Sequence, residues 1–157
     1  MPKFSIIIPV CNNHELTASC VRSIEKNTTD YELIIIDNGS TEPYAGSGII
    51  IRNKKNEGFP KAVNQGIKRA EGEIIVLLNN DTIVPANWLN NICVHLDKYD
   101  VVGPCADNIG GVQNVPHAKN LVDSSFEEIA ERFHQENNGQ SMPSHRLVFF
   151  CVAIKRE

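Results

Sequence analysis

Positive charge is scarce in this sequence, and long apolar runs are missing. The 15 lysines and arginines are outnumbered by 19 aspartates and glutamates, which gives a formal net charge of -4 at pH 7. Basic clusters interleaved with aromatic residues do not occur, so no nucleic-acid partner is expected. No run approaches the ~20 apolar residues of a membrane-spanning helix, and no transmembrane segment is expected.

The opening stretch also lacks the features of a targeting signal. MPKFSIIIPV contains a short apolar run with Pro9 inside it, but it has neither the longer apolar region nor the cleavage site of a signal peptide. These absences predict a cytoplasmic location, and association with the inner face of the membrane stays open.

Cysteine usage and missing motifs argue against several further classes. The five cysteines are an odd number and form no CxxC pair, which predicts reduced thiols and speaks against zinc. The chain contains no GxxxxGK[ST], no GxGxxG after its first apolar run, no HExxH and no GxSxG. The usual nucleoside triphosphatase and dehydrogenase signatures are therefore absent. With 157 residues, of which 41% are hydrophobic, one compact domain is expected.

Four short runs rich in β-branched residues predict buried strands. They cover residues 4–8, 32–36, 48–51 and 73–78. Apolar residues at helical spacing predict helices over 14–27, 59–72 and 85–98. This order is typical of an α/β sandwich with a mainly parallel central sheet. Ligands of such folds bind at the carboxyl ends of the strands.

Capping signals predict the helix ends. Asn13 is the expected N-cap of the first helix. The second helix should have Pro60 in its first turn and end at Gly72, and the third should follow Pro85. The apolar stripe of the first helix contains Leu16, Cys20, Val21 and Ile24, and that of the third contains Trp88, Leu89, Ile92, Cys93 and Leu96.

Beyond residue 106 the pattern weakens. Residues 106–115 are typical of a loop, and 123–137 predict an amphipathic helix capped by Ser124 or Ser125. Residues 146–154 are expected to form another strand.

Three polar clusters follow the predicted strands: PVCNN after the first, DNGSTE after the second and NNDT after the fourth. They should converge at the carboxyl edge of the sheet. For Asp37 to Thr41 an ordinary turn and a contact to a base or ribose both stay open. Asp81 could bind a hard divalent cation through oxygen, although one carboxylate needs further ligands from a substrate.

Four stretches in order carry a family resemblance: FSIIIPVCNN, YELIIIDNGSTE, NEGFPKAVNQGIKRAEGEIIVLLNNDTIVPANWL and FFCVAIKRE. Together they resemble the family 2 glycosyltransferases of GT-A fold, and most of all the rhamnosyltransferase-like subgroup. The resemblance implies a GT-A (Rossmann-like) α/β/α sandwich whose C-terminal part is truncated. Residues 1–106 would form the nucleotide-sugar-binding core, and 107–157 the incomplete start of the acceptor-side portion.

The resemblance also implies site residues. The donor would contact Pro9, Val10, Asn12, Asp37, Asn38, Asn56, Gly58, Asn64, Asn79 and Asn80. Asp81 would bind the metal, Mn²⁺ or Mg²⁺, and Asn79 is neutral where the family motif DxD begins with an acid. Cys11 stands where an aromatic residue is frequent, and Val63 stands where an arginine is frequent.

The implied reaction is metal-assisted transfer, with inversion, of a sugar from a nucleoside-diphosphate sugar to an acceptor hydroxyl. The donor would be a UDP- or dTDP-sugar and the acceptor a glycan or a lipid-linked molecule, in the synthesis of cell-surface polysaccharide. The general base is expected beyond Glu157. The alternative is a catalytically inactive nucleotide-binding or scaffolding module on the same fold. A receiver-like signalling domain is disfavoured, because Asn12 and Asn13 stand where it needs an acidic pair.

Overall fold

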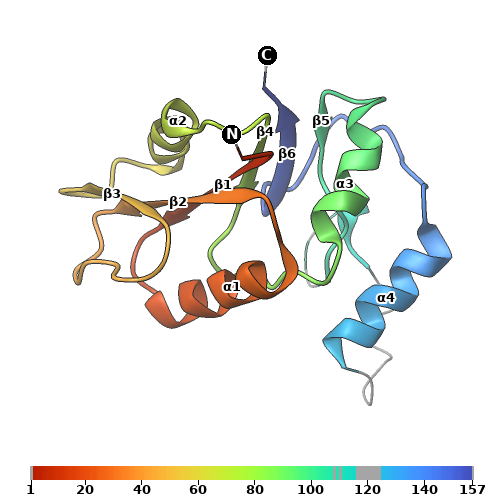
Figure 1. The fold of residues 1–157 in the computed structure, drawn as a ribbon, viewed down its shortest axis with the longest axis horizontal. Helices are drawn as coiled ribbons and strands as arrows, with labels where there is room; N and C mark the ends of the chain where they lie inside the picture. Colours follow the sequence, from red (N-terminus) through yellow and green to blue (C-terminus); the bar gives the residue numbers. More distant parts are fainter. Residues whose placement is uncertain (1, 108, 110, 116–124, 157) are drawn as a thin grey trace.

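A computed structural model describes residues 2–107, 109, 111–115 and 125–156, and its centre is a mixed β-sheet (Figure 1). Within these residues the strand order is β3-β2-β1-β4-β6-β5. Their bounds are β1 Phe4–Val10, β2 Tyr31–Asn38, β3 Ile49–Asn53, β4 Ile74–Leu78, β5 Val101–Val102 and β6 Cys151–Lys155. Strands β3, β2, β1 and β4 are parallel, whereas β6 runs antiparallel to both β4 and β5.

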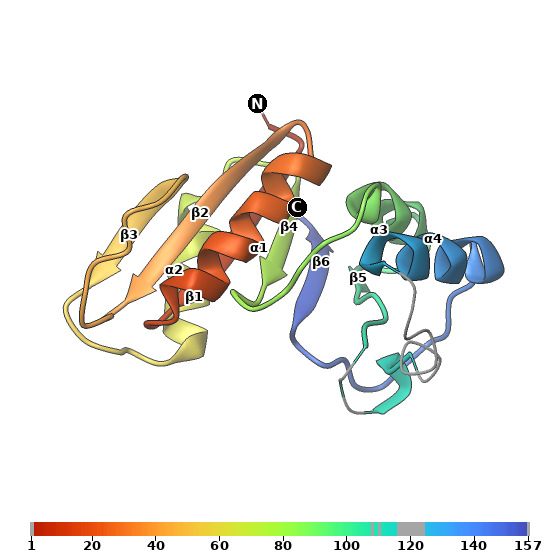
Figure 2. The same ribbon diagram turned by 90° about the horizontal axis from the view of Figure 1, so that it is seen from below.

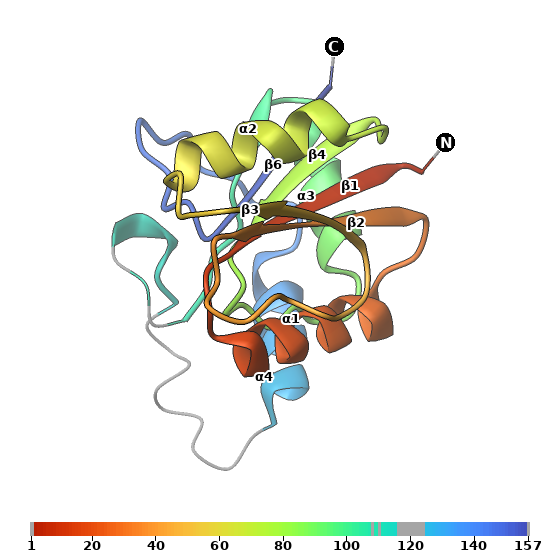
Figure 3. The same cartoon turned by 90° about the vertical axis from the view of Figure 1, so that its left-hand side faces the viewer.

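Helices cover both faces of this sheet, as predicted. Helix α2 (Phe59–Arg69) lies on one face, and α1 (His14–Asn27) and α3 (Trp88–Leu96) lie on the other. Figure 3 shows the three layers edge-on, and Figure 2 shows α1 lying along the central strands, with α3 farther toward β6. Helix α4 (Phe126–Asn137) lies outside these layers and contributes no buried residue.

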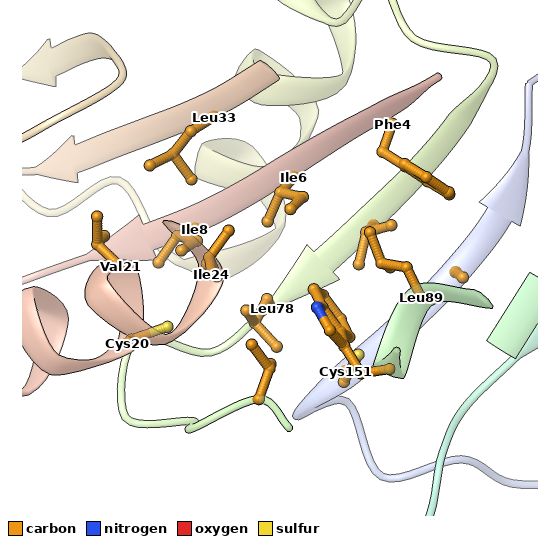
Figure 4. Packing of buried hydrophobic residues seen from close by; sticks show 14 of the residues in the cluster. Phe4, Ile6, Ile8, Cys20, Val21, Ile24, Leu33, Leu78, Leu89 and Cys151 are labelled. Carbon is orange, nitrogen blue, oxygen red and sulfur yellow. The ribbon is translucent and has the colours of Figure 1, made fainter. Parts of the chain in front are cut away.

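Alternation along the strands divides the core in two. In β1, Ile6 and Ile8 pack toward α1 and α3, while Ile7 packs toward α2, and all three are fully buried. Figure 4 shows the larger cluster, in which Cys20 from α1 and Cys151 from β6 also lie. The prediction of buried strands is confirmed for β1, β2 and β4, which are apolar on both faces. It is wrong for β3, where Ile50 is 40% exposed, because β3 is an edge strand.

Several predicted boundaries are wrong by a few residues. Helix α2 ends at Arg69 with Ala70 as its C-cap, so Gly72 does not end it. Gly72 instead lies where a Cβ would come within 2.7 Å of the backbone of Phe4 and Ser5. Helix α3 begins at Trp88 rather than directly after Pro85, because the intervening residues form a turn.

The N-terminal end of α1 also departs from expectation. Leu16 was expected on the apolar stripe but is 50% exposed, whereas its neighbour Thr17 is fully buried. The Thr17 hydroxyl donates to the Asn13 carbonyl and accepts from the Asn80 amide, which satisfies it inside the protein. Asn13 does occupy the N-cap position, but its backbone is left-handed and its side chain makes no capping bond.

The observed strands also differ from the predicted ones. Strand β2 continues through Asp37 and Asn38, which pair with Arg52 and Asn53 of β3, so these polar residues end the strand rather than follow it. The two-residue strand β5 was not predicted, and a short 3₁₀ helix, η1 (Gly111–Gln113), interrupts the predicted loop.

The C-terminal elements bear out part of the prediction. Ser125 caps α4 in a capping box with Glu128, while the alternative cap Ser124 lies outside the described residues. The last strand starts later than expected, at Cys151. No helix in the described part of the chain has the length and apolarity needed to cross a bilayer. The division of the chain at residue 106 stays a prediction.

Candidate functional site at the carboxyl edge of the sheet

The carboxyl ends of the central strands bring the three polar clusters to one edge. Val10 at the end of β1 pairs with Asp37 near the end of β2, and β4 ends on the other side of β1 at Leu78. The antiparallel strand β6 begins at the same edge, where Cys151 pairs with Leu78. Residues before β6 therefore join this edge, although they lie far away in sequence.

Asp37 is the most thoroughly bonded acid at the edge. Its side chain is fully buried and accepts hydrogen bonds from the backbone N–H groups of Ser40 (3.0 Å) and Tyr44 (3.1 Å). The Arg52 guanidinium completes the set at 2.9 Å and is itself 40% exposed. Burial acts to raise the pKa of Asp37, but the bonds from Ser40 and Tyr44 and the charge of Arg52 outweigh it and lower that pKa.

Asn12 connects the loop after β1 to the loop after β2. Its backbone N–H donates to the Ser40 hydroxyl at 2.8 Å, and its side-chain oxygen accepts from the Thr41 N–H at 3.0 Å. Asn12 has a left-handed backbone (φ 61°), which asparagine adopts more readily than most residues. Its neighbour Val10 packs in the core, and Pro9 is half-buried, so these two residues offer the edge less polar surface than Asn12 does.

A network of side-chain amides fixes the loop in front of α2. Asn38 is 4% exposed, and its Nδ2 donates to the Asn56 side chain at 3.0 Å and to the Gly58 carbonyl at 3.4 Å. Its Oδ1 accepts from Asn53 at 2.9 Å and from the Glu57 N–H at 3.0 Å. This neutral network places Asn56 and Gly58 beside the end of β2.

The NNDT segment contributes a more open acid. The Asn79 N–H donates to the Phe150 carbonyl at 2.8 Å, and the Asn80 amide donates to Thr17 at 3.0 Å. Asp81 is exposed and forms no ion pair among the described residues. Those residues also contain no cluster of three or more His, Cys, Asp or Glu side chains that could hold a metal ion. Any ion bound here would therefore need ligands besides Asp81.

An open groove of about 350 Å³ lies at the start of α2, and its walls are Phe59, Pro60, Val63, Asn64 and Phe149. The rings of Phe59 and Phe149 are 6.5 Å apart between centroids and nearly perpendicular, at 89°. Figure 3 shows the chain before β6 beside the first turn of α2. Asn64 was predicted as a site residue, but the two phenylalanines were not, because 90 residues separate them and no spacing rule connects them.

The chain also matches a model of a known protein family. The model described as Glycosyl transferase family 2 matches residues 5–157, which is nearly the whole chain. The chain belongs to glycosyl transferase family 2.

Curated relatives of this family 2 domain are glycosyltransferases. A "PGL/p-HBAD biosynthesis glycosyltransferase" of Mycobacterium bovis is 30% identical over 111 residues, covering 63% of this chain and 43% of that protein. "Glycosyltransferase GlyG" of Streptococcus pneumoniae is 28% identical over 110 residues, covering 61% of this chain and 36% of that protein. The family 2 domain described here thus spans less than half the length of these relatives.

Solved structures show the same fold. A mannosyltransferase from Pyrobaculum calidifontis, solved with GDP-Man and Mn²⁺, matches with a TM-score of 0.58 and 21% identity, over 68% of this chain and 36% of that one. TarS 1-349 of S. aureus, solved with UDP-GlcNAc, matches with a TM-score of 0.57 and 23% identity, over 70% of this chain and 36% of that one. The predicted GT-A fold is confirmed.

Proposed function

We propose that this family 2 domain binds a nucleoside-diphosphate sugar at the carboxyl edge of its sheet and takes part in metal-assisted sugar transfer with inversion to an acceptor hydroxyl. The observation that supports this most is the difference between Asp37 and Asp81. The buried Asp37 carboxylate is already hydrogen-bonded within the protein, whereas Asp81 is exposed and follows a fully buried strand. The Asp81 carboxylate has no ion-pair partner among the described residues, so it is free to bind a ligand at this edge.

The residues around Asp81 fit a hard divalent cation such as Mn²⁺ or Mg²⁺. Asp81 offers a carboxylate, and the side-chain oxygens of Asn79 and Asn80 have no hydrogen bond within the described residues. Oxygen ligands are those that such cations prefer, and the donor's phosphates would supply the rest. The bound ion would stabilise the negative charge that develops on the departing nucleoside diphosphate.

The other edge residues would form the surface that the nucleoside meets and keep that surface in shape. Asn12, Asn38, Asn56 and Gly58 connect three loops into one surface, so the donor would meet a preorganised site. In this proposal Asp37 does not contact the donor. It holds the loop after β2 in place through its bonds to Ser40 and Tyr44. No described residue is assigned as the general base.

Nucleotide binding tests this proposal. Thermal-shift and calorimetric titrations with UDP and dTDP, each with and without Mn²⁺, should show binding that the metal strengthens. Asp81→Ala should remove the metal-dependent part of the shift without changing the melting temperature of the free protein, because Asp81 is exposed and has no ion-pair partner in the described part of the chain. Asp107→Ala, at another acid of the described chain, serves as the matched control. A mutant that keeps the full metal response would refute the assignment.

An inactive nucleotide-binding or scaffolding module remains the second candidate, and the lack of a multi-acid metal cluster among the described residues favours it. A turnover assay with UDP- and dTDP-sugars and a glycan acceptor, run on the full-length protein, separates the two. Donor binding without formation of a glycosylated product would favour the inactive nucleotide-binding or scaffolding module.

A further inference from the structure

Helix α1 holds the segment after β4, which contains Asp81, through side chains on one of its faces. Four side chains spaced by three or four positions along α1 form hydrogen bonds to residues 79–84. The Asn80 Nδ2 donates to Thr17 (3.0 Å), Cys20 donates to the Asn79 carbonyl (3.6 Å), the Val84 N–H donates to Ser23 (3.1 Å) and Asn27 donates to the Val84 carbonyl (2.8 Å). Asp81 has no ion-pair partner in the described chain, so the bonds of its neighbours fix its place.

The bond from Asn80 to Thr17 involves the residue directly before Asp81. The Thr17 hydroxyl is fully buried, and it donates its single hydrogen to the Asn13 carbonyl at 3.1 Å. Toward Asn80 it can therefore only accept, so it pairs with the amide nitrogen and not with the amide oxygen. The Asn80 Oδ1 is thus left without a hydrogen bond among the described residues and is free for a ligand.

The Thr17 hydroxyl is not needed to complete α1. The Asn13 carbonyl already accepts the Thr17 backbone N–H at 3.1 Å, which is an ordinary helical bond. A valine at this position would retain the branched Cβ and would leave the Asn13 carbonyl with that bond. What the hydroxyl adds is therefore the bond to Asn80.

The same hydroxyl links two loops of the edge. Asn13 belongs to the loop after β1 and Asn80 to the loop after β4, so one buried oxygen connects both loops. From another side, the Asn79 N–H donates to the Phe150 carbonyl at 2.8 Å. The residues before Asp81 are thus held by two separate elements, while the Asp81 side chain stays exposed. Such bonds orient a ligand group without touching the ligand.

We propose that Thr17 is a positioning residue whose buried hydroxyl orients the Asn80 amide, so that the Asn80 oxygen and the Asp81 carboxylate are both available to a divalent cation. Thr17 itself would contact neither the cation nor the nucleotide, because it is fully buried. Removal of such supporting partners typically lowers metal affinity about 10- to 100-fold. This inference rests on the proposed function and adds to it a residue outside the predicted site.

Calorimetry on the full chain tests this inference with UDP or dTDP, whichever binds wild type more tightly. The ratio of the Kd without Mn²⁺ to the Kd with Mn²⁺ measures what the metal adds to nucleotide binding. Thr17→Val, which replaces the hydroxyl by a methyl group, should reduce that ratio about tenfold or bring it close to one. Thr17→Ser keeps the hydroxyl and should keep the wild-type ratio, although it loses a buried methyl group and some stability.

Ser23→Ala is the matched control. Its hydroxyl is also buried on the same face of α1, but it accepts from the Val84 N–H, three residues beyond Asp81. The ratio should therefore stay at the wild-type value in Ser23→Ala, even where urea denaturation shows that the variant is destabilised. In the background of Asn80→Ala, Thr17→Val should cause no further reduction, because its partner is already removed. If circular dichroism shows that Thr17→Val does not fold, Thr17→Ala, which removes the same hydroxyl, is measured in its place.

Each alternative result has a definite meaning. A wild-type ratio in Thr17→Val overturns the inference while the proposed function stands. An equal reduction in Thr17→Ser would assign the effect to the buried methyl group, and an equal reduction in Ser23→Ala would assign it to general loosening of residues 79–84. Either result also overturns the inference. If Mn²⁺ does not strengthen nucleotide binding by wild type, the proposed role of the metal fails and this inference fails with it.

Discussion

Removal of the Asp37 carboxylate should destabilise the fold strongly. Asp37→Ala leaves two backbone N–H groups, of Ser40 and Tyr44, without their acceptor in a region where Asp37 is fully buried. It also leaves Arg52 without its partner at 2.9 Å, although the 40% exposure of that side chain lets water replace part of the loss. Unsatisfied buried groups each cost about 1–3 kcal/mol, so we expect a loss of about 2–4 kcal/mol in the free energy of unfolding.

Urea denaturation followed by tryptophan fluorescence measures this loss. Trp88 is the one tryptophan of the chain and is 6% exposed, so its emission should change on unfolding. Arg52→Met should cost about 1 kcal/mol or less, because it removes the ion pair but leaves both backbone bonds to Asp37. The double mutant then isolates the coupling between the two side chains. A loss below about 0.5 kcal/mol in Asp37→Ala would refute the structural role of this acid.

The pH dependence of the same difference has a definite sign. The pKa of Asp37 is lowered in the folded state, so its stabilisation is present above the unfolded pKa of about 3.9. That stabilisation is lost as pH falls through the lower, folded pKa. The gap between wild type and Asp37→Ala should therefore be constant near neutrality and shrink in acid. Asp97→Ala is the control, because the Asp97 side chain is 89% exposed and should show almost no gap at any pH.

Two further predictions concern a glycine and the buried thiols. Gly39→Ala should destabilise by more than about 2 kcal/mol, because φ is +80° and a Cβ would lie 2.3 Å from the Lys55 carbonyl carbon, whereas Gly139→Ala, with φ +72° and open space, should cost about 1 kcal/mol. Denaturation curves that gave equal losses would contradict the predicted clash. Burial raises the pKa of both Cys20 and Cys151 to about 12, so iodoacetamide should label neither thiol in the native protein at mildly alkaline pH and both in guanidinium. Rapid native labelling, detected by mass spectrometry, would show that the core opens there.

Local sequence patterns were sufficient to predict the layered fold, but they did not predict its short edge strand or the exposure of Leu16. Runs such as residues 74–78 are apolar on both faces, and such strands can be buried only inside a doubly covered sheet. Strand β5 has two residues and, among the residues that the structure describes, pairs only with β6, so its formation depends on a chain segment about 50 residues away. The exposure of Leu16 was missed for a similar reason, because the partner of Thr17 is the distant Asn80.

The candidate site, too, could be predicted from the sequence only in part. The order of strands and helices predicts that Asn12, Asp37 and Asp81 meet at one edge, because parallel strands carry their carboxyl ends to the same side. Residue types alone do not reveal which acid is free. Asp37 is enclosed by a turn whose N–H groups point at it, and this follows from the fold of residues 37–44 rather than from composition. The Phe59 and Phe149 pair required the packing of α2 against the chain before β6.

The polar residues at the edge thus form two groups, those whose side chains are hydrogen-bonded within the protein and those whose side chains are not. Asp37 and Asn38 have buried side chains with at least three internal hydrogen bonds each, so a ligand could bond them only by displacing a partner. Asp81 and Asn64 are exposed and have no such partner within the described residues. A ligand gains the full value of a new bond only from groups of the second kind, because groups of the first kind must first break an existing one. Binding energy at this edge should therefore come from Asp81 and the groove beside Asn64, while Asp37 and Asn38 determine how rigidly that surface is presented.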